Sequence, residues 1–310
     1  MDRAEVLAAL IDPARQRGLE IGPLDRPMVT RAMGQVEYVD RASRAGLVAA
    51  YHGHEVDSAR ILEIDHVWGE QSLLDCVGGA RVYDYVLASH VIEHVPDVFG
   101  WLGEIASVLA DGGLAVFFVP DKRHTFDARR PVSTGGEFVD AFVRGLRRPD
   151  ARQVFNHVYD TRDLDAPPLG EAELTERARQ GLDLARRTGG EYLDAHCWVF
   201  TPRSLVDALD LASRLDLLPF ELAHTEQGAD EFLIALRRLP EATTPAARRD
   251  AFVASLARIA LPDDVGTGGD AAVLQAQARA ALARADAIES STIWRATAPL
   301  RALLGRLRGR

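Results

Sequence analysis

The feature that most constrains the fold of this chain is a pair of short apolar segments, each followed by a turn or an acid. The first leads into Glu20-Ile-Gly-Pro-Leu24, and the second, Val36-Glu-Tyr-Val-Asp40, closes on a carboxylate. In an open α/β sheet, the turn after one parallel strand and the acid that ends the next lie beside the same crevice. The backbone of the turn and the carboxylate can bind the two hydroxyls of an adenosine ribose there. The pair therefore predicts a nucleoside-binding crevice.

The rest of the first half alternates between apolar strands and helices. Residues 83–89 are almost continuously apolar, as central parallel strands are when both faces are buried. Strands are expected at 18–21, 35–40, 59–68, 83–89 and 114–119, and helices at 2–16, 42–52 and 98–109. This alternation predicts a Rossmann-like, doubly wound α/β sheet that is mostly parallel. A helix starting at Thr201-Pro202 precedes segments 219–225 and 231–236, which flank a glycine-containing turn and predict a C-terminal antiparallel hairpin.

Composition and periodicity divide the chain into four expected regions. These are a nucleoside-binding core at 1–120, a helical lid or substrate insertion at 121–195, a helix and hairpin completing the core at 196–240, and a helical C-terminal arm at 241–310. The insertion carries many prolines and glycines around two expected helices, at 137–147 and 171–187. So long an excursion inside a compact domain is usually functional.

The C-terminal arm has its own composition, rich in alanine, leucine and arginine. Helices are expected at 246–260 and 271–289, with a glycine-rich linker at 266–269. The arm is expected to pack on its own domain or on the partner in a homodimer. Docking to another protein or to anionic lipid headgroups is the alternative.

Charge and cysteine content exclude several classes of protein. The formal net charge is −10, and no basic cluster occurs before the last stretch of the chain, so a nucleic-acid partner is not expected. The two cysteines, Cys76 and Cys197, are far apart, which predicts no disulfide framework and fits a reducing cytoplasm. The N-terminus lacks the apolar core of a signal peptide, and no apolar run is long enough to span a membrane. Composition thus predicts a soluble cytoplasmic protein.

Several motifs resemble those of a known enzyme family. Tyr83-Asp-Tyr-Val-Leu-Ala-Ser-His-Val-Ile-Glu-His-Val-Pro-Asp97 and Leu109-Ala-Asp-Gly-Gly-Leu-Ala-Val-Phe117 resemble signatures of class I S-adenosylmethionine-dependent methyltransferases of the type 11-like group. Pro120-Asp-Lys-Arg-His-Thr-Phe-Asp127 and His196-Cys-Trp-Val-Phe-Thr-Pro202 resemble a bacterial subgroup associated with polysaccharide biosynthesis. The resemblance covers roughly residues 15–238. The chain departs from the family's usual glycine-rich first turn, because only Gly22 of its glycines remains.

The resemblance implies an activity and its cofactor. It implies methyl transfer from S-adenosylmethionine to a small polar acceptor, most specifically O-methylation of a sugar hydroxyl in surface-polysaccharide assembly. Residues 291–301 resemble a tail found on glycosyltransferases, which adds a glycosyltransferase as an expected partner of the arm. The rival function is a catalytically silent methyltransferase-fold module that scaffolds a glycosyltransferase or another partner. A nicotinamide dehydrogenase is disfavoured because the first turn lacks Gly-x-Gly-x-x-Gly.

The same resemblance implies which residues contact the cofactor. Gly22 and the turn up to Arg26 would face the methionyl group, and Asp40 the ribose. Asp65 would meet the adenine amino group, or would be a turn residue at a strand end. The full expected cofactor-binding set is Glu20, Gly22, Pro23, Asp40, Asp65, Ser89 and His90. For Glu20 and Asp40 the alternatives are a loop-capping acid and a surface carboxylate that caps the next helix.

Candidate catalytic and substrate residues lie at the ends of the fourth and fifth expected strands and on the lid. His90 can act as a general base because the ordinary pKa of histidine lies near neutrality, or it can be a packed or cofactor-orienting residue. His124 and Asp121 are the other catalytic candidates. Arg123, His157 and His196 are the candidate substrate-binding residues. The alternatives are an ion-paired anchor for the lid, built from Asp121, Arg123 and Asp127, and structural roles for the two lid histidines.

No metal ion is predicted from these motifs. His90-Val-Ile-Glu-His94 matches the inverted zinc-protease pattern His-x-x-Glu-His. That chemistry needs both histidines on one face of a well-formed helix, whereas here the motif directly follows a buried strand and precedes Pro96. Glu93 and His94 are therefore expected to stabilise the turn. A metal ion shared by Asp121, His124 and a lid histidine lacks support from tight ligand spacing.

Overall fold

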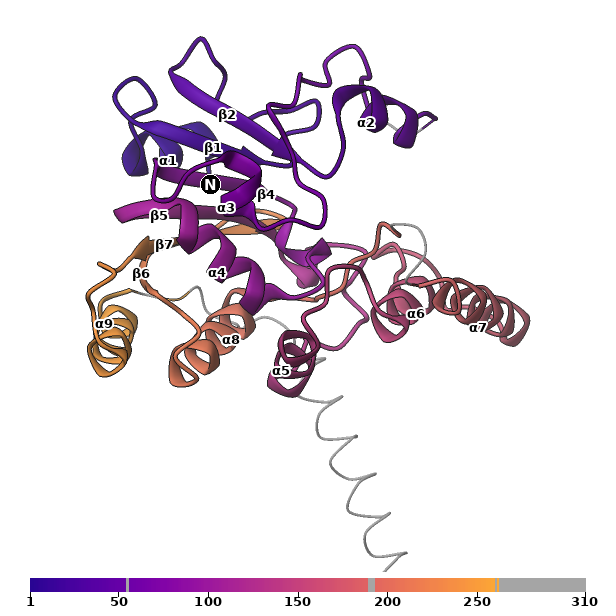
Figure 1. Cartoon of the computed structure of the whole chain (residues 1–310). Helices are drawn as coiled ribbons and strands as arrows, with labels where there is room; N and C mark the ends of the chain where they lie inside the picture. The colour runs from indigo at the N-terminus through magenta and orange to yellow at the C-terminus, as the bar shows by residue number, and fades with distance from the viewer. Residues whose placement is uncertain (54–55, 189–192, 260, 262–310) are drawn as a thin grey trace, which may run out of the picture. The chain divides into compact units, whose positions relative to one another are not determined.

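A seven-stranded mixed sheet forms the centre of the computed structural model, which describes residues 1–53, 56–188, 193–259 and 261 (Figure 1). The strand order is β3-β2-β1-β4-β5-β7-β6. The strands are β1 Arg17–Ile21, β2 Gln35–Asp40, β3 His66–Val67, β4 Tyr83–Ser89, β5 Leu109–Pro120, β6 Phe220–Gln227 and β7 Glu231–Arg238. The first five are parallel, and β7 runs antiparallel to both β5 and β6. The predicted mostly parallel sheet and its C-terminal hairpin are both confirmed.

Helices cover both faces of this sheet. The α-helices are α1 Arg3–Leu10, α2 Arg44–Ala50, α3 Leu73–Val77, α4 Val98–Val108, α5 Gly135–Arg144, α6 Ala151–Asp160, α7 Glu171–Ala185, α8 Pro202–Arg214 and α9 Pro245–Arg258, with 3-10 turns η1 Ile92–His94 and η2 Lys122–His124. All these elements belong to one compact unit, Met1–Asp263. No helix of the described residues is both long and apolar enough to cross a bilayer.

Two apolar layers bury the sheet, because alternate residues of its strands point to opposite faces. On β4, Val86 and Ala88 join the larger core with α4 and α8, which lie on one face in Figure 1. Tyr85 and Leu87 point the other way and join the smaller core, to which α1 contributes. This two-sided burial explains why the sequence of β4 is almost continuously apolar.

The order of the strands reverses direction between β1 and β4. β1 pairs with β2 on one side and with β4 on the other, so the connections leave these two strands in opposite directions. A crevice opens at such a switch point, outside the carboxyl ends of the strands, and ligands bind there in open α/β sheets. The residues after Ile21, Asp40 and Ser89 are therefore the ones placed to contact a ligand.

The third strand differs from its prediction. Only His66–Val67 pairs with β2, rather than the expected segment 59–68. Residues 61 and 62 direct their backbone groups elsewhere, since Ile61 O accepts from Arg44 Nε at 2.8 Å and Leu62 N donates to Leu24 O at 3.2 Å. Leu62 and Ile64 instead pack against the smaller core, and the apolar pattern of this segment comes from that packing. It does not come from sheet pairing.

Other boundaries also differ from the sequence prediction. α1 ends at Leu10, where the chain becomes extended ahead of Pro13, so the expected helix over 2–16 was too long. Asp111-Gly-Gly113 lies between the expected helix at 98–109 and the expected strand at 114–119, but in the structure it belongs to the strand. It forms a bulge inside β5, where the pairing shifts from Tyr83 with Leu109 to Tyr85 with Leu114. α3 and α6 were not predicted.

The irregular segment after β5 is tied to the core by aromatic stacking. Phe138 of α5 stacks on Trp198 with ring centroids 4.3 Å apart, and on Phe99 of α4 at 5.5 Å. Trp198 Nε1 donates to Val95 O. The four-region division of the chain stays a prediction, and the part of the arm beyond residue 261 lies outside the described residues.

Candidate active site

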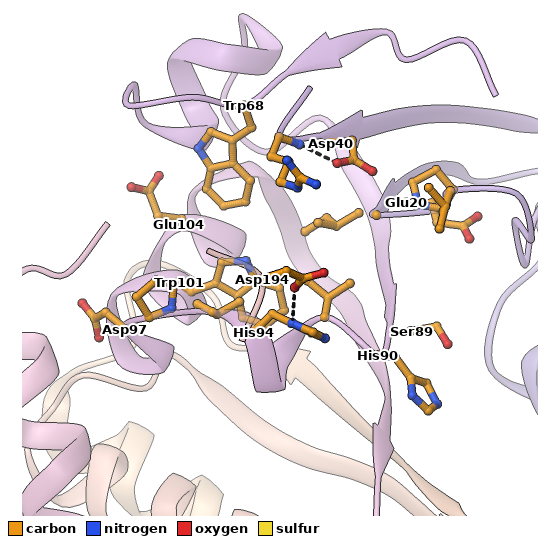
Figure 2. A pocket seen from close by; sticks show the side chains of 18 of the residues that line it. Glu20, Asp40, Trp68, Ser89, His90, His94, Asp97, Trp101, Glu104 and Asp194 are labelled. Carbon is orange, nitrogen blue, oxygen red and sulfur yellow. Dashed lines mark hydrogen bonds and ion pairs between the residues drawn. The ribbon is translucent and has the colours of Figure 1, made fainter. Parts of the chain in front are cut away.

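A cavity of about 810 Å³ lies at the switch point of the sheet (Figure 2). It lies between the turn after β1, the end of β2, the turn after β4 and the start of α4. Figure 2 shows Glu20, Ser89 and His90 on one side, Trp68, Glu104 and Trp101 on the other, and Asp40 and Asp194 between them. We call this the switch-point cavity.

The turn after β1 is held open by a buried acid. Gly22 has φ +66°, and a Cβ there would lie 2.9 Å from Val91 Cγ2, so a larger residue would be both strained and crowded. The carboxylate of Glu20 accepts from Met28 N at 2.7 Å and from Val29 N at 3.1 Å. Burial raises the pKa of Glu20 to about 7 against these two hydrogen bonds. Glu20 therefore fixes the path of the loop that frames the cavity.

Asp40 ends β2 at the wall of the same cavity. Its Oδ1 accepts from Arg41 N at 2.7 Å, as drawn in Figure 2. Burial raises the pKa of Asp40 to about 6, although backbone hydrogen bonds and Arg41 favour the carboxylate. The carboxylate still has acceptor capacity toward a ligand, because two oxygens offer about four lone-pair positions.

His90 follows β4 in an unusual backbone conformation. Its φ is +53°, a region that non-glycine residues rarely adopt, and its N–H donates to Phe118 O at 2.9 Å. The side chain turns toward β7, where Nε2 lies 2.9 Å from Glu231 Oε2. Arg3 of α1 also donates to Glu231. Although burial opposes ionisation of Glu231, the hydrogen bonds from His90 and Arg3 lower its pKa to about 2.

A second charged pair lies on the opposite wall. His94 Nδ1 is 2.8 Å from Asp194 Oδ1, an interaction visible in Figure 2. Burial opposes both charges, but the pairing lowers the pKa of Asp194 to about 2 and raises that of His94. The pair joins the turn after β4 to the segment that leads into α8.

The sequence did not single out every residue on this wall. Trp68, Trp101, Glu104, Arg147 and Asp194 also line the cavity. Trp101 was not predicted as a site residue because it lies among the apolar positions of a helix. Indole side chains at such positions usually pack in the core. Asp194 comes from the irregular insertion, whose path no periodic pattern specifies.

The structure does not bring Asp65 to the cavity. Asp65 precedes β3, and its carboxylate accepts from Arg31 NH2 at 2.8 Å and from Tyr38 N at 2.7 Å. It acts there as a turn residue that stabilises the strand edge. Trp68 and Gly69 line the cavity at the corresponding place.

The three polar residues after β5 also lie outside the cavity lining. Asp121 is fully buried and accepts from both Nε and NH2 of Arg123, while Gln227 Nε2 donates to it at 3.2 Å. Asp121 and Arg123 thus form an ion pair, as in the alternative of a lid anchor, although Asp127 pairs with Arg130 and His196 instead. His124 is exposed on η2. Asp121, Arg123 and His124 were all expected to lie in the site, and none of them lines the cavity.

The lid histidines form part of a buried cluster behind the cavity wall. His196 Nδ1 lies 2.5 Å from Asp127 Oδ2, and His196 N donates to His157 Nδ1 at 3.2 Å. Burial, followed by the nearby charges of His196 and Arg130, lowers the pKa of His157 to about 4. Neither histidine lines the switch-point cavity.

Sequence comparison assigns the family. A family model described as a methyltransferase domain matches residues 3–212, which is more than half of the chain. The chain belongs to this methyltransferase family. Together with the sheet order, the match makes it a class I S-adenosylmethionine-dependent methyltransferase fold, and S-adenosylmethionine is its cofactor.

Comparison with solved structures finds further methyltransferases. An S-adenosylmethionine-dependent methyltransferase from Mesorhizobium loti is 15% identical, with 76% of this chain and 96% of that chain covered and a TM-score of 0.39. One from Methanosarcina mazei is also 15% identical, covering 76% and 98% with a TM-score of 0.40. One from Aquifex aeolicus is 9% identical, covering 77% and 90% with a TM-score of 0.37. No curated protein sequence matched the chain.

The residues of the cavity fit a sulfonium nucleoside. When bound, the cofactor supplies an activated methyl group on sulfur. Gly22 keeps the first turn free of a side chain, and Asp40 offers acceptors suited to two ribose hydroxyls. Acidic side chains at several points of the lining suit a cation. Of the expected cofactor-binding residues, Glu20, Gly22, Pro23, Asp40, Ser89 and His90 line the cavity, and Asp65 does not.

Proposed function

We propose that this methyltransferase O-methylates a small polar acceptor, specifically a sugar hydroxyl in surface-polysaccharide biosynthesis. The observation that carries the proposal is the polar composition of the cavity wall facing Asp40. Asp97, Glu104, Arg147 and Asp194 line it together with two indole rings. Hydroxyl-rich ligands match such a lining, because carboxylates and guanidinium groups supply acceptors and donors while the indoles supply flat apolar contact.

The volume of the cavity favours a small acceptor. Pockets of about 300–1,000 Å³ hold drug-sized ligands, and the switch-point cavity, at about 810 Å³, falls within that range. A cofactor that occupies the part near Gly22 and Asp40 leaves room for a compact acceptor in the rest of the cavity. The assignment to polysaccharide biosynthesis rests on the resemblance of residues 120–127, 196–202 and 291–301, the last of which lies outside the described residues.

His90 is the proposed general base. It lies at the carboxyl end of β4, lines the cavity, and has Nε2 held by Glu231. Its other ring nitrogen, Nδ1, is left to accept a proton from an acceptor hydroxyl. His124 and Asp121 do not share this position. We expect His90→Gln to lower kcat by about 10²–10⁴-fold, as removal of a general base does, and to weaken binding of S-adenosylmethionine by a smaller factor.

The direct test of the acceptor is a comparison of surface glycans from cells with and without this protein. Mass spectrometry should show a sugar that lacks one methylene mass when the protein is absent, and purified protein with S-adenosylmethionine should restore it. An unchanged glycan profile would contradict the sugar assignment. Cofactor binding without transfer to any hydroxyl acceptor would favour the silent scaffold instead.

A further inference from the structure

A cluster of three metal-ligating side chains lies beside the switch-point cavity. One ligand atom each from Glu93, His94 and His196 lies within 4.8 Å of the other two. Glu93 and His94 belong to η1 after β4, whereas His196 belongs to the segment before α8. The fold therefore assembles the group from distant parts of the chain. We call these three residues the Glu93 cluster.

Glu93 is a buried acid without a hydrogen-bonded partner. Its side chain is 1% exposed, and within the described residues neither carboxylate oxygen has a hydrogen bond. The nearest nitrogens are His90 Nδ1 and His94 Nε2, each 3.8 Å from Glu93 Oε1, which is beyond hydrogen-bonding distance. Burying a carboxylate with no hydrogen bond is costly, so the position calls for a cation close to these oxygens.

The two histidines are oriented as metal ligands usually are. His94 Nδ1 lies 2.8 Å from Asp194, and His196 Nδ1 lies 2.5 Å from Asp127. Each carboxylate fixes one ring nitrogen and leaves Nε2 of the same ring available. Such carboxylate–histidine–metal arrangements orient the ring and strengthen its basicity toward an ion. Asp127 is held in turn by Arg130, whose NH1 donates to it at 2.7 Å.

We infer that the Glu93 cluster binds a divalent transition-metal ion of the zinc type. Two imidazoles and one carboxylate suit zinc and its neighbours, whereas magnesium and calcium prefer oxygen ligands alone. Ligands about 2.1 Å from a tetrahedral zinc ion lie about 3.4 Å apart, so side-chain movements of roughly 1 Å would close the cluster. The ion would lie behind His94, at the cavity wall, and would link η1 to the segment that carries Asp194.

This site differs from a zinc-protease arrangement. His90, the first histidine of the His-x-x-Glu-His pattern, turns toward Glu231 and does not belong to the cluster. His196 takes the third ligand position in its place. The inference does not depend on the identity of the methyl acceptor.

The test is calorimetric titration of the full-length, tag-free protein with zinc chloride after treatment with a chelator. We expect saturable binding of one zinc ion per chain and a rise in thermal stability with zinc. Glu93→Gln should abolish this binding, and Asp127→Asn should weaken it about 10–100-fold, as loss of a ligand-orienting carboxylate does. His224→Ala is the matched control, because His224 is partly exposed, on β6, and outside the cluster.

X-ray absorption of the zinc-loaded wild-type protein supplies a readout that does not depend on how the variants fold. A first shell of nitrogen and oxygen at about 2.0–2.1 Å with two imidazoles is the expected result. Absence of saturable binding would overturn the inference. So would binding that persists in folded Glu93→Gln, or a first shell that contains sulfur or oxygen alone.

Discussion

At the scale of single residues, Asp40 carries the proposed contact with the cofactor ribose. The pKa of Asp40 is raised to about 6 by burial, whereas hydroxyl donors would favour its charged form. A ligand that binds the carboxylate must therefore displace a proton when the pH lies below 6. We expect the affinity for S-adenosylmethionine to be constant above pH 7 and to fall by up to about tenfold per pH unit below pH 6.

Calorimetric titration of the wild type and of Asp40→Asn between pH 5 and 8 measures this dependence. The variant should bind more weakly at pH 8 and should lose the part of the pH dependence that comes from this carboxyl. An unchanged affinity in the variant would remove Asp40 from the cofactor site.

Glu20 is a second single residue with a testable role, because its carboxylate holds the loop after β1. In Glu20→Ala, the amides of Met28 and Val29 lose their acceptor, and an unsatisfied buried donor costs about 1–3 kcal/mol. We expect a lower free energy of unfolding in denaturant titration at pH 8, together with weaker cofactor binding. Removal of the buried charge offsets part of the loss, since the raised pKa of Glu20 means that its carboxylate is itself destabilised there.

Glu63→Ala is the matched control for this experiment. The Glu63 side chain is 84% exposed, so its removal should change stability by no more than about 0.5 kcal/mol. Equal losses in the two variants would show that Glu20 has no special role in the loop.

At the scale of elements, the segment between residues 194 and 200 holds one wall of the cavity against the core. Trp198 stacks on Phe138 and donates to Val95 O, while Asp194 reaches His94. Trp198→Ala should lower the free energy of unfolding by about 3–5 kcal/mol, because it removes a fully buried aromatic side chain. Trp198→Phe keeps the stacking and loses the hydrogen bond, so it should cost less. Chemical denaturation of both variants checks this order, and the reverse order would contradict it.

The elements also show where sequence patterns are informative. β2 and β4 begin and end where expected, because the apolar residues of each strand end at a polar residue, Asp40 or Ser89, that marks the edge of the sheet. β3 was mispredicted because the apolar residues before it, Leu62 and Ile64, pack against the smaller core without pairing in the sheet, and such packing leaves the same signal as a strand. α6 was missed although it is amphipathic, because it is short and lies between Pro149 and Pro167 in a segment rich in proline and glycine.

At the scale of the whole molecule, topology determines which predicted residues meet. The strand order brings the ends of β1, β2 and β4 together, and so Gly22, Asp40 and His90 line one cavity. The residues after β5 sit one strand further along, where Asp121 and Arg123 instead bind each other and Gln227. Both groups of residues follow the carboxyl end of a strand, and on that ground both were predicted to contact a ligand. The difference depends on side-chain pairing, which the sequence pattern does not encode.

The central claim is that the cofactor lies across the switch point, between the turn after β1 and the end of β2. A crystal structure of the protein soaked with S-adenosylhomocysteine tests it most directly. We expect density for the ligand in the switch-point cavity, with its ribose hydroxyls within hydrogen-bonding distance of the Asp40 carboxylate and its amino-acid portion beside Gly22. Density for the ligand elsewhere on the protein, with this cavity blocked by side chains, would contradict the account.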